Sequence, residues 1–140
     1  MTVMTAAAIE DFLDDVFPQR CGTIEAVSEM RATMSLAIED EHLRPGASVS
    51  GPTMMGLADV CLYVAILAQI GPEPMAVTSN LNCHFLRRAR GDRDPNPLGG
   101  SPEEILGIGD AGNAIAGLTS PRDFNSDSLL GSGFMQATWK

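Results

Sequence analysis

The stretch from Pro52 to Pro72, PTMMGLADVCLYVAILAQIGP, decides the fold of this chain. Pro52 suits the first turn of a helix, and Gly71-Pro72 ends one. Apart from the weakly polar thiol of a cysteine, only four side chains from position 53 to position 70 carry polar atoms: Thr53, Asp59, Tyr63 and Gln69. A helix that is apolar on every side is either wrapped by protein or spans a membrane.

The membrane alternative fits this helix poorly. A membrane-spanning helix needs about 20 apolar residues, and Thr53–Ile70 reaches that length only with its flanking Gly-Pro pairs. No cation lies directly beside the stretch, and an unpaired Asp59 within a bilayer would be costly. We therefore expect a sheet of the same chain to wrap the helix.

The residues before the helix supply one amphipathic helix and two strands. Apolar side chains recur at helical spacing from Thr5 to Val16, with Thr5 as a possible cap. Polar and apolar residues alternate in Cys21–Glu29 and Arg31–Ile38, which predicts half-buried strands. The polar segment Glu39–Gly46 ends in Pro-Gly and is predicted to be a loop.

The residues after the helix predict up to four more strands. Met75–Leu86 is the first of them, and Gly133–Trp139 is the last. Between them, Ile105-Leu106 and Ala114–Ala116 are predicted to form a hairpin, although glycines weaken the signal. The Arg-, Gly- and Pro-rich segment 90–103 is predicted to be a flexible loop. A single α+β domain spanning 1–140 follows, with one sheet around one long helix.

Composition excludes several classes of function. The net charge of −9 argues against binding to nucleic acid or to an anionic membrane surface. The three cysteines lack the spacing of a disulfide framework or a zinc site, so we expect reduced thiols and no metal. The N-terminal segment MTVMTAAAIEDFLDDV lacks the basic and apolar regions of a signal peptide. We expect a cytoplasmic location.

Asp59 is the best candidate for catalysis. It is the only charged residue between Arg44 and Glu73, and it lies two turns into the apolar helix. A carboxylate in such surroundings can have its pKa tuned toward a general base. The alternative, which the sequence leaves equally open, is a structural carboxylate that binds a backbone group or an Arg at a dimer seam.

Three further groups could contribute to a site. Ser50-Gly51-Pro52 precedes the helix, where outward-pointing N–H groups could hold an oxyanion, but the same residues could simply cap the helix. Thr78, Asn80 and Asn82 alternate along one predicted strand and should share a face, which could equally be solvated. Arg87 and Arg88 open an arginine cluster that could bind the phosphates of coenzyme A or could be a solvated loop.

The stretch Arg44–Ala89, RPGASVSGPTMMGLADVCLYVAILAQIGPEPMAVTSNLNCHFLRRA, resembles the PaaI-like branch of the hotdog-fold thioesterases. In that family an HGG-type turn opens the central helix, an LAD-type motif follows, and an AVT…N…NFLRPA strand comes next. The stretch covers about a third of the chain. The resemblance implies a hotdog fold, an antiparallel sheet wrapped around one long central helix.

The resemblance also implies roles for individual residues. Leu57-Ala58-Asp59 matches the LAD-type motif, which makes Asp59 the general base or nucleophile. Gly51 matches the first Gly of the HGG turn, the oxyanion donor, and Thr78 matches a hydroxyl that orients water. The sequence departs from the pattern at Ser50, at Pro52 and over residues 91–140, which fit the family poorly.

The implied activity is hydrolysis of an acyl-CoA thioester, with coenzyme A as part of the substrate and no further cofactor. The active site would lie between two subunits, so a homodimer or homotetramer is expected, with Ser50, Pro52, Asn80, Asn82, Arg87 and Arg88 near the substrate. A dimer is also favoured because it would cover an exposed sheet edge and an apolar helix face. The alternative is a hotdog protein that binds acyl-CoA without turnover, or one with a structural role, because of the altered Ser-Gly-Pro turn.

Overall fold

The computed structural model describes residues 2–46, 48–85, 104–110, 115–119 and 133–139. It contains the α-helices α1 (Ala6–Val16) and α2 (Gly51–Ile70), and a short 3-10 helix at Asp40–His42. The strands are β1 (Thr23–Ser28), β2 (Arg31–Ala37), β3 (Leu43–Arg44), β4 (Ser48–Val49), β5 (Thr78–Phe85), β6 (Glu104–Asp110), β7 (Ile115–Thr119) and β8 (Gly133–Trp139).

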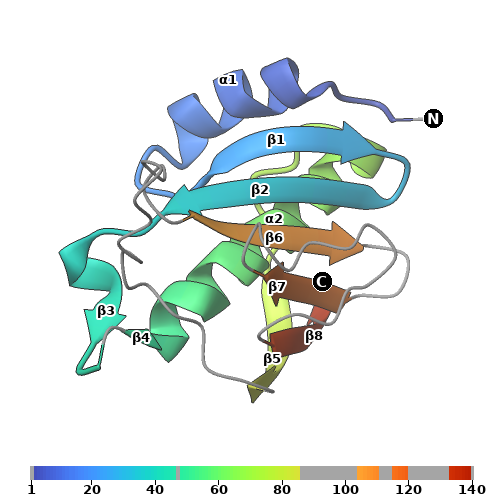
Figure 1. Cartoon of the computed structure of the whole chain (residues 1–140). Helices are drawn as coiled ribbons and strands as arrows, with labels where there is room; N and C mark the ends of the chain where they lie inside the picture. The colour runs from blue at the N-terminus through green and yellow to red at the C-terminus, as the bar shows by residue number, and fades with distance from the viewer. Residues whose placement is uncertain (1, 47, 86–103, 111–114, 120–132, 140) are drawn as a thin grey trace.

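Six strands form one antiparallel sheet in the order β1-β2-β6-β7-β8-β5. The sheet curves around α2, which contacts β1, β2, β6 and β7 (Figure 1). Strand β5 follows α2 in the chain and lies at one edge of the sheet, while β1 lies at the other. The predicted arrangement, an α+β hotdog with an antiparallel sheet around one long central helix, is confirmed.

The buried core lies between α2 and the sheet. Eleven of the α2 residues are buried: Met54, Leu57, Ala58, Val60, Cys61, Leu62, Tyr63, Val64, Ala65, Leu67 and Ala68. By length and composition α2 could cross a membrane, but the core helix of a globular protein passes the same test. Burial of the helix on most sides explains why its sequence has no polar face.

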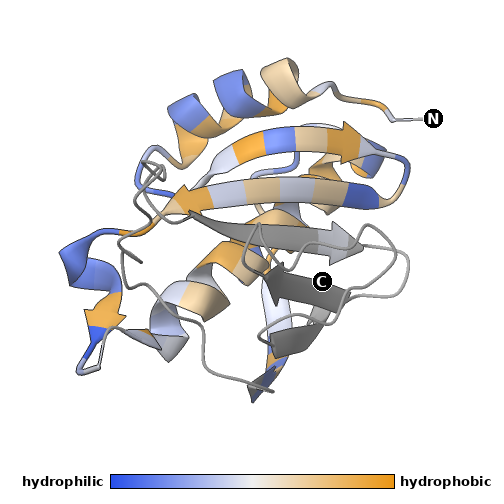
Figure 2. Cartoon of the chain, in the orientation of Figure 1, coloured by the Kyte–Doolittle hydropathy of each residue, from blue (hydrophilic) through white to orange (hydrophobic). Residues whose placement is uncertain are grey.

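Helix α1 covers the β1 end of the fold. Thr5 caps it, with its hydroxyl accepting a hydrogen bond from the N–H of Ala8, as predicted. Hydrophilic and hydrophobic residues alternate along α1 (Figure 2), and the buried ones are Ile9 and Leu13. The helix thus contributes one apolar stripe to the core.

The predicted loop at Glu39–Gly46 is more ordered than its polar sequence suggests. It contains the 3-10 helix, and its end pairs with the next residues in a two-stranded hairpin, β3–β4. Gly46 lies in the turn of that hairpin with φ of +82°, which a side chain other than glycine disfavours. The hairpin ends at Val49, and Ser50 then leads directly into α2.

The predicted hairpin after the helix is present, but Gly109, which was predicted to lie in its turn at Gly109–Gly112, belongs to β6 and has a packing role. Strands β6 and β7 pair antiparallel. A Cβ atom on Gly109 would lie 2.8 Å from the carbonyl oxygen of Cys61. The backbone of β6 therefore lies directly against the backbone of α2, and only glycine allows this approach. The predicted loop at 90–103 lies outside the described residues.

Candidate active site

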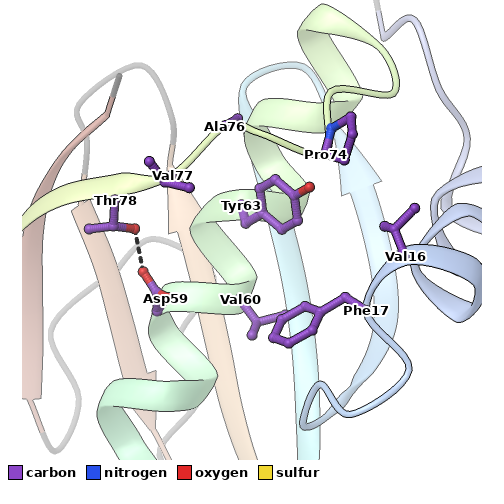
Figure 3. A pocket seen from close by; sticks show the side chains of 9 residues that line it. All are labelled: Val16, Phe17, Asp59, Val60, Tyr63, Pro74, Ala76, Val77 and Thr78. Carbon is purple, nitrogen blue, oxygen red and sulfur yellow. Dashed lines mark hydrogen bonds between the residues drawn. The ribbon is translucent and has the colours of Figure 1, made fainter.

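Asp59 projects from the middle of α2 and accepts a hydrogen bond from a strand. Its Oδ1 atom lies 2.5 Å from the hydroxyl of Thr78, the first residue of β5 (Figure 3). The neighbours Ala58 and Val60 are buried, whereas Asp59 is only half-buried. Because a threonine hydroxyl has a single hydrogen to donate, this contact engages one oxygen of Asp59 and leaves the second for another partner.

A β-bulge in β5 directs Thr78 toward the helix. Thr78 pairs with Trp139 and Asn80 pairs with Thr138, so Ser79 is an extra residue on the β5 side of this ladder. Thr78 consequently faces Asp59 on α2, whereas Asn80 is exposed. The prediction that Thr78, Asn80 and Asn82 share one face is wrong for Thr78, because strict alternation fails where a bulge adds a residue.

Two cavities meet at the Asp59–Thr78 pair. The first, here called the Phe17 cavity, has a volume of about 360 Å³ and is drawn in Figure 3. Its lining residues come from the end of α1, from α2 and from the segment before β5: Val16, Phe17, Asp59, Val60, Tyr63, Pro74, Ala76, Val77 and Thr78. Most of these side chains are apolar, and Asp59, Tyr63 and Thr78 carry the polar side-chain atoms.

The second cavity, here called the Asn80 cavity, lies on the other side of the same pair. It has a volume of about 390 Å³ and is lined by Met55, Gly56, Asp59, Thr78, Ser79, Asn80 and Leu81. Its exposed lining residues Ser79 and Asn80 are polar, whereas those of the Phe17 cavity, Val16, Pro74 and Val77, are apolar. A ligand that extends from one cavity to the other would pass beside Asp59, which lines both.

The start of α2 presents a single free amide for an anion. Ser50 caps the helix: its hydroxyl oxygen accepts a hydrogen bond from the N–H of Thr53 at 3.3 Å. Pro52 has no N–H. Of the first three helical residues, only Gly51 therefore keeps an N–H that neither the helix nor the cap uses.

Gly51 lies too far from Asp59 to act on the same atom within one chain. The two residues are eight positions apart on α2, which corresponds to about 12 Å along the helix axis. The oxygen that accepts a hydrogen bond from the Gly51 N–H and the carbon that is attacked at Asp59 belong to the same carbonyl group, so they are neighbouring atoms. One chain therefore cannot supply both groups to one substrate.

Comparisons with known proteins agree with this architecture. Residues 46–94 match the family model described as the thioesterase superfamily. A candidate thioesterase from Silicibacter sp. TM1040 has a similar structure, with 27% identity and a TM-score of 0.69, over 100% of this chain and 94% of that one. The chain has the hotdog fold, and its residues 46–94 resemble the thioesterase superfamily. No curated protein sequence matches it significantly.

Two solved structures with lower sequence identity share the fold. Thioesterase superfamily member 2 of zebrafish has 13% identity and a TM-score of 0.69, over 97% of this chain and 98% of that one. The PaaI protein of Escherichia coli, from the phenylacetic acid degradation operon, has 14% identity and a TM-score of 0.62, over 96% of this chain and 91% of that one. The resemblance to PaaI-like proteins predicted from Arg44–Ala89 is confirmed.

The remaining predicted residues fall into two groups. Asn80 and Asn82 do share a face of β5, where the side-chain amide of Asn82 donates to the side-chain oxygen of Asn80 at 3.0 Å. Asn80 lines a cavity, and both side chains are exposed. Arg87 and Arg88 lie outside the described residues.

The residues that build the Phe17 cavity carry no signal in the sequence that marks them as functional. Phe17 and Tyr63 come from different elements, and their sequence patterns indicate only core. The hydroxyl of Tyr63 donates to the backbone oxygen of Glu73 at 3.1 Å. Burial, reinforced by the charge of Glu73, raises the pKa of Tyr63, so the phenol stays neutral at physiological pH.

The thiols differ in their surroundings. Cys61 is fully buried, and its Sγ lies 3.4 Å from the backbone oxygen of Ala32. Burial raises the pKa of the Cys61 thiol to about 12. Burial and the nearby charge of Asp59 raise the pKa of Cys21, which argues against Cys21 as a thiolate nucleophile. Among the described residues, no three His, Cys, Asp or Glu side chains are grouped to hold a metal ion.

Proposed function

We propose that this protein hydrolyses an acyl-CoA thioester to a free acid and coenzyme A. The observation that carries the proposal is Asp59, a half-buried carboxylate that is held by Thr78 and opens toward two cavities. A carboxylate placed in this way can accept a proton from water or attack a carbonyl itself. The match of residues 46–94 to the thioesterase superfamily supports thioester hydrolysis as the type of reaction.

In the general-base route, Asp59 removes a proton from a water molecule while the water oxygen attacks the thioester carbon. The carbonyl oxygen becomes an oxyanion, which accepts a hydrogen bond from the Gly51 N–H of a second subunit. The carbon–sulfur bond then breaks, and the coenzyme A thiolate leaves and takes up a proton. In the nucleophilic route a carboxylate oxygen of Asp59 attacks the thioester carbon and expels the coenzyme A thiolate, which takes up a proton. Water then hydrolyses the mixed anhydride to the free acid and regenerates Asp59.

The helix geometry supports a shared site in a dimer. Gly51 and Asp59 of one chain cannot reach the same thioester, but a twofold axis can bring Gly51 of one subunit to Asp59 of the other. Strand β5 supports the same arrangement, because it is an edge strand of the sheet and its backbone groups can pair with a second copy.

The test is hydrolysis of a panel of acyl-CoAs by the wild type and by Asp59→Asn. We expect turnover by the wild type and a loss of about 10²- to 10⁴-fold in the variant, the usual contribution of a general base. Asp11→Asn, the same chemical change at an exposed residue of α1, is the matched control and should keep full activity. Equal activity of the wild type and Asp59→Asn would refute the role of Asp59.

A non-catalytic acyl-CoA-binding protein is the second candidate. The Ser-Gly-Pro turn favours it, because Pro52 and the Ser50 cap leave only one N–H for an oxyanion. Calorimetry with the same panel separates the two candidates. Tight binding of an acyl-CoA that stays intact over hours would favour the binding protein over the enzyme.

A further inference from the structure

Phe17 forms a wall of the apolar cavity beside Asp59. It follows α1 directly, and its N–H donates to the carbonyl oxygen of Leu13 at 2.7 Å. Its ring lies next to Val60, one residue after Asp59 on α2 (Figure 3). Phe17 is partly buried and packs against the core. The ring therefore occupies space that a longer ligand in this cavity would need.

A half-buried arginine fixes the backbone position of Phe17. The Arg20 side chain is 9% exposed, and its guanidinium donates to the carbonyl oxygen of Phe17 at 3.3 Å and to Asp14 at 2.9 Å. The same guanidinium pairs with Glu10, and a carboxylate oxygen of Glu10 accepts the N–H of Ile24 at 2.9 Å. The backbone of Phe17 is thus held at the end of α1 by hydrogen bonds, which set the place from which its ring enters the cavity.

The chemistry of the cavity suits a hydrocarbon group. Its polar side chains are Asp59, Thr78 and Tyr63, and each has a hydrogen bond within the protein. The other lining side chains are apolar. At roughly 30 Å³ for each water-sized group, the volume of about 360 Å³ holds about a dozen non-hydrogen atoms. The Asn80 cavity, with its exposed Ser79 and Asn80, suits a polar chain instead.

We propose that Phe17 determines acyl selectivity: the Phe17 cavity takes the acyl group, and the ring limits it to compact apolar groups of about a dozen non-hydrogen atoms or fewer. The pantetheine arm then leaves across the Asn80 cavity, with the thioester carbon at Asp59. This proposal rests on the proposed thioesterase activity.

The test compares kcat/KM for straight-chain acyl-CoAs from four to sixteen carbons. We expect the wild type to prefer the shorter members and Phe17→Ala to shift the preference to longer ones. The ratio of long-chain to short-chain kcat/KM should rise at least about tenfold, since one methylene in an apolar pocket changes discrimination by roughly 10- to 200-fold. Phe17→Trp should shift the preference to still shorter chains than in the wild type.

Phe12→Ala is the matched control. Phe12 lies on α1 and is partly buried against the core like Phe17, but it does not line the cavity. The two alanine variants therefore lose comparable packing, and only Phe17→Ala should change the chain-length preference. An active Phe17→Ala protein with the wild-type preference, or an equal shift in Phe12→Ala, would overturn the proposal. Phe17→Leu replaces Phe17→Ala if the latter does not fold, and the same outcomes apply.

If the wild type hydrolyses none of the panel, the proposed activity is refuted. The role of Phe17 in the pocket is then tested by ligand binding. In that case the shift in Tm with free carboxylic acids of graded length replaces kcat/KM. A longer optimal acid for Phe17→Ala than for the wild type supports the pocket. The same optimal acid for both proteins refutes it.

Discussion

The hydroxyl of Thr78 donates a hydrogen bond of 2.5 Å to the carboxylate of Asp59, nineteen residues earlier in the chain. The contact joins the first residue of β5 to the middle of α2 (Figure 3). It fixes the carboxylate between the two cavities, and it satisfies one oxygen that would otherwise be poorly solvated. The orientation of the proposed general base therefore depends on a residue from another element.

Removal of the Thr78 hydroxyl should reduce catalysis without unfolding the protein. A hydrogen bond to a charged group contributes about 1.5–3 kcal/mol, so we expect Thr78→Val to lower kcat roughly 10- to 100-fold. Thr78→Ser keeps the hydroxyl and should stay close to wild type. Steady-state kinetics with one good acyl-CoA substrate measure both variants. If Thr78→Val and Thr78→Ser have the same kcat, the hydrogen bond does not position Asp59.

Mixing two inactive variants should restore activity if the site is shared. Gly51→Pro removes the oxyanion N–H at a helix position that accepts proline, and Asp59→Asn removes the base. A mixed dimer holds one site with both groups intact. Random exchange of subunits should therefore return about a quarter of the wild-type activity. Absence of recovery after refolding from denaturant, where wild-type chains recover, would contradict a site built from two subunits.

The protein is expected to be at least a homodimer at micromolar concentration. Analytical ultracentrifugation tests this, since a dimer has twice the 14.8 kDa mass of the chain. Strand β5 at the sheet edge and the exposed apolar side chains Met75 and Val77 before it should lie at the interface. Val77→Lys should then weaken the association. A stable and active monomer would contradict both the dimer and the shared site.

Replacement of glycine by alanine should have opposite effects on stability at Gly109, which contacts α2, and at Gly56, which lies within it. In Gly109→Ala the new Cβ would meet the carbonyl oxygen of Cys61 at 2.8 Å, and we expect a loss of about 1–3 kcal/mol in the free energy of unfolding. In Gly56→Ala the nearest atom is the sulfur of Cys21 at 3.8 Å, which is an ordinary contact. Higher helix propensity should stabilise this variant by up to about 1 kcal/mol. Urea unfolding measures both, and equal effects would contradict the close packing of β6 on α2.

Burial of Cys61 should make the protein sensitive to alkaline pH. The folded thiol has a pKa of about 12, whereas an exposed thiol ionises near about 8.5. Between these values the unfolded chain binds fewer protons than the folded one, so the free energy of unfolding falls as pH rises, with a limiting slope of roughly 1 kcal/mol per pH unit. Cys61→Ala should lose this component although it is less stable overall. Parallel pH profiles for the two proteins would contradict the predicted shift.

Local patterns were sufficient to predict the elements of the fold. The all-apolar stretch between Pro52 and Gly71 predicted the central helix, because only a helix wrapped by protein tolerates apolar residues on every side. Alternation predicted β1 and β2, and the last strand was predicted at Gly133–Trp139, where β8 lies. The glycines of β6 weakened the prediction there, because the reason for Gly109 lies in α2 and not in its own strand.

The sequence by itself determined the central helix, the isolated carboxylate of Asp59 within it and the resemblance to PaaI-like proteins. These depend on residue type and spacing along one segment, which local physics governs. Only the tertiary structure decided that Thr78 meets Asp59 and that Phe17 forms a pocket wall beside it. The first depends on a bulge at Ser79 that reverses the side-chain alternation, and the second on packing between α1 and α2. Neither the bulge nor the packing of distant segments leaves a periodic signal in the chain.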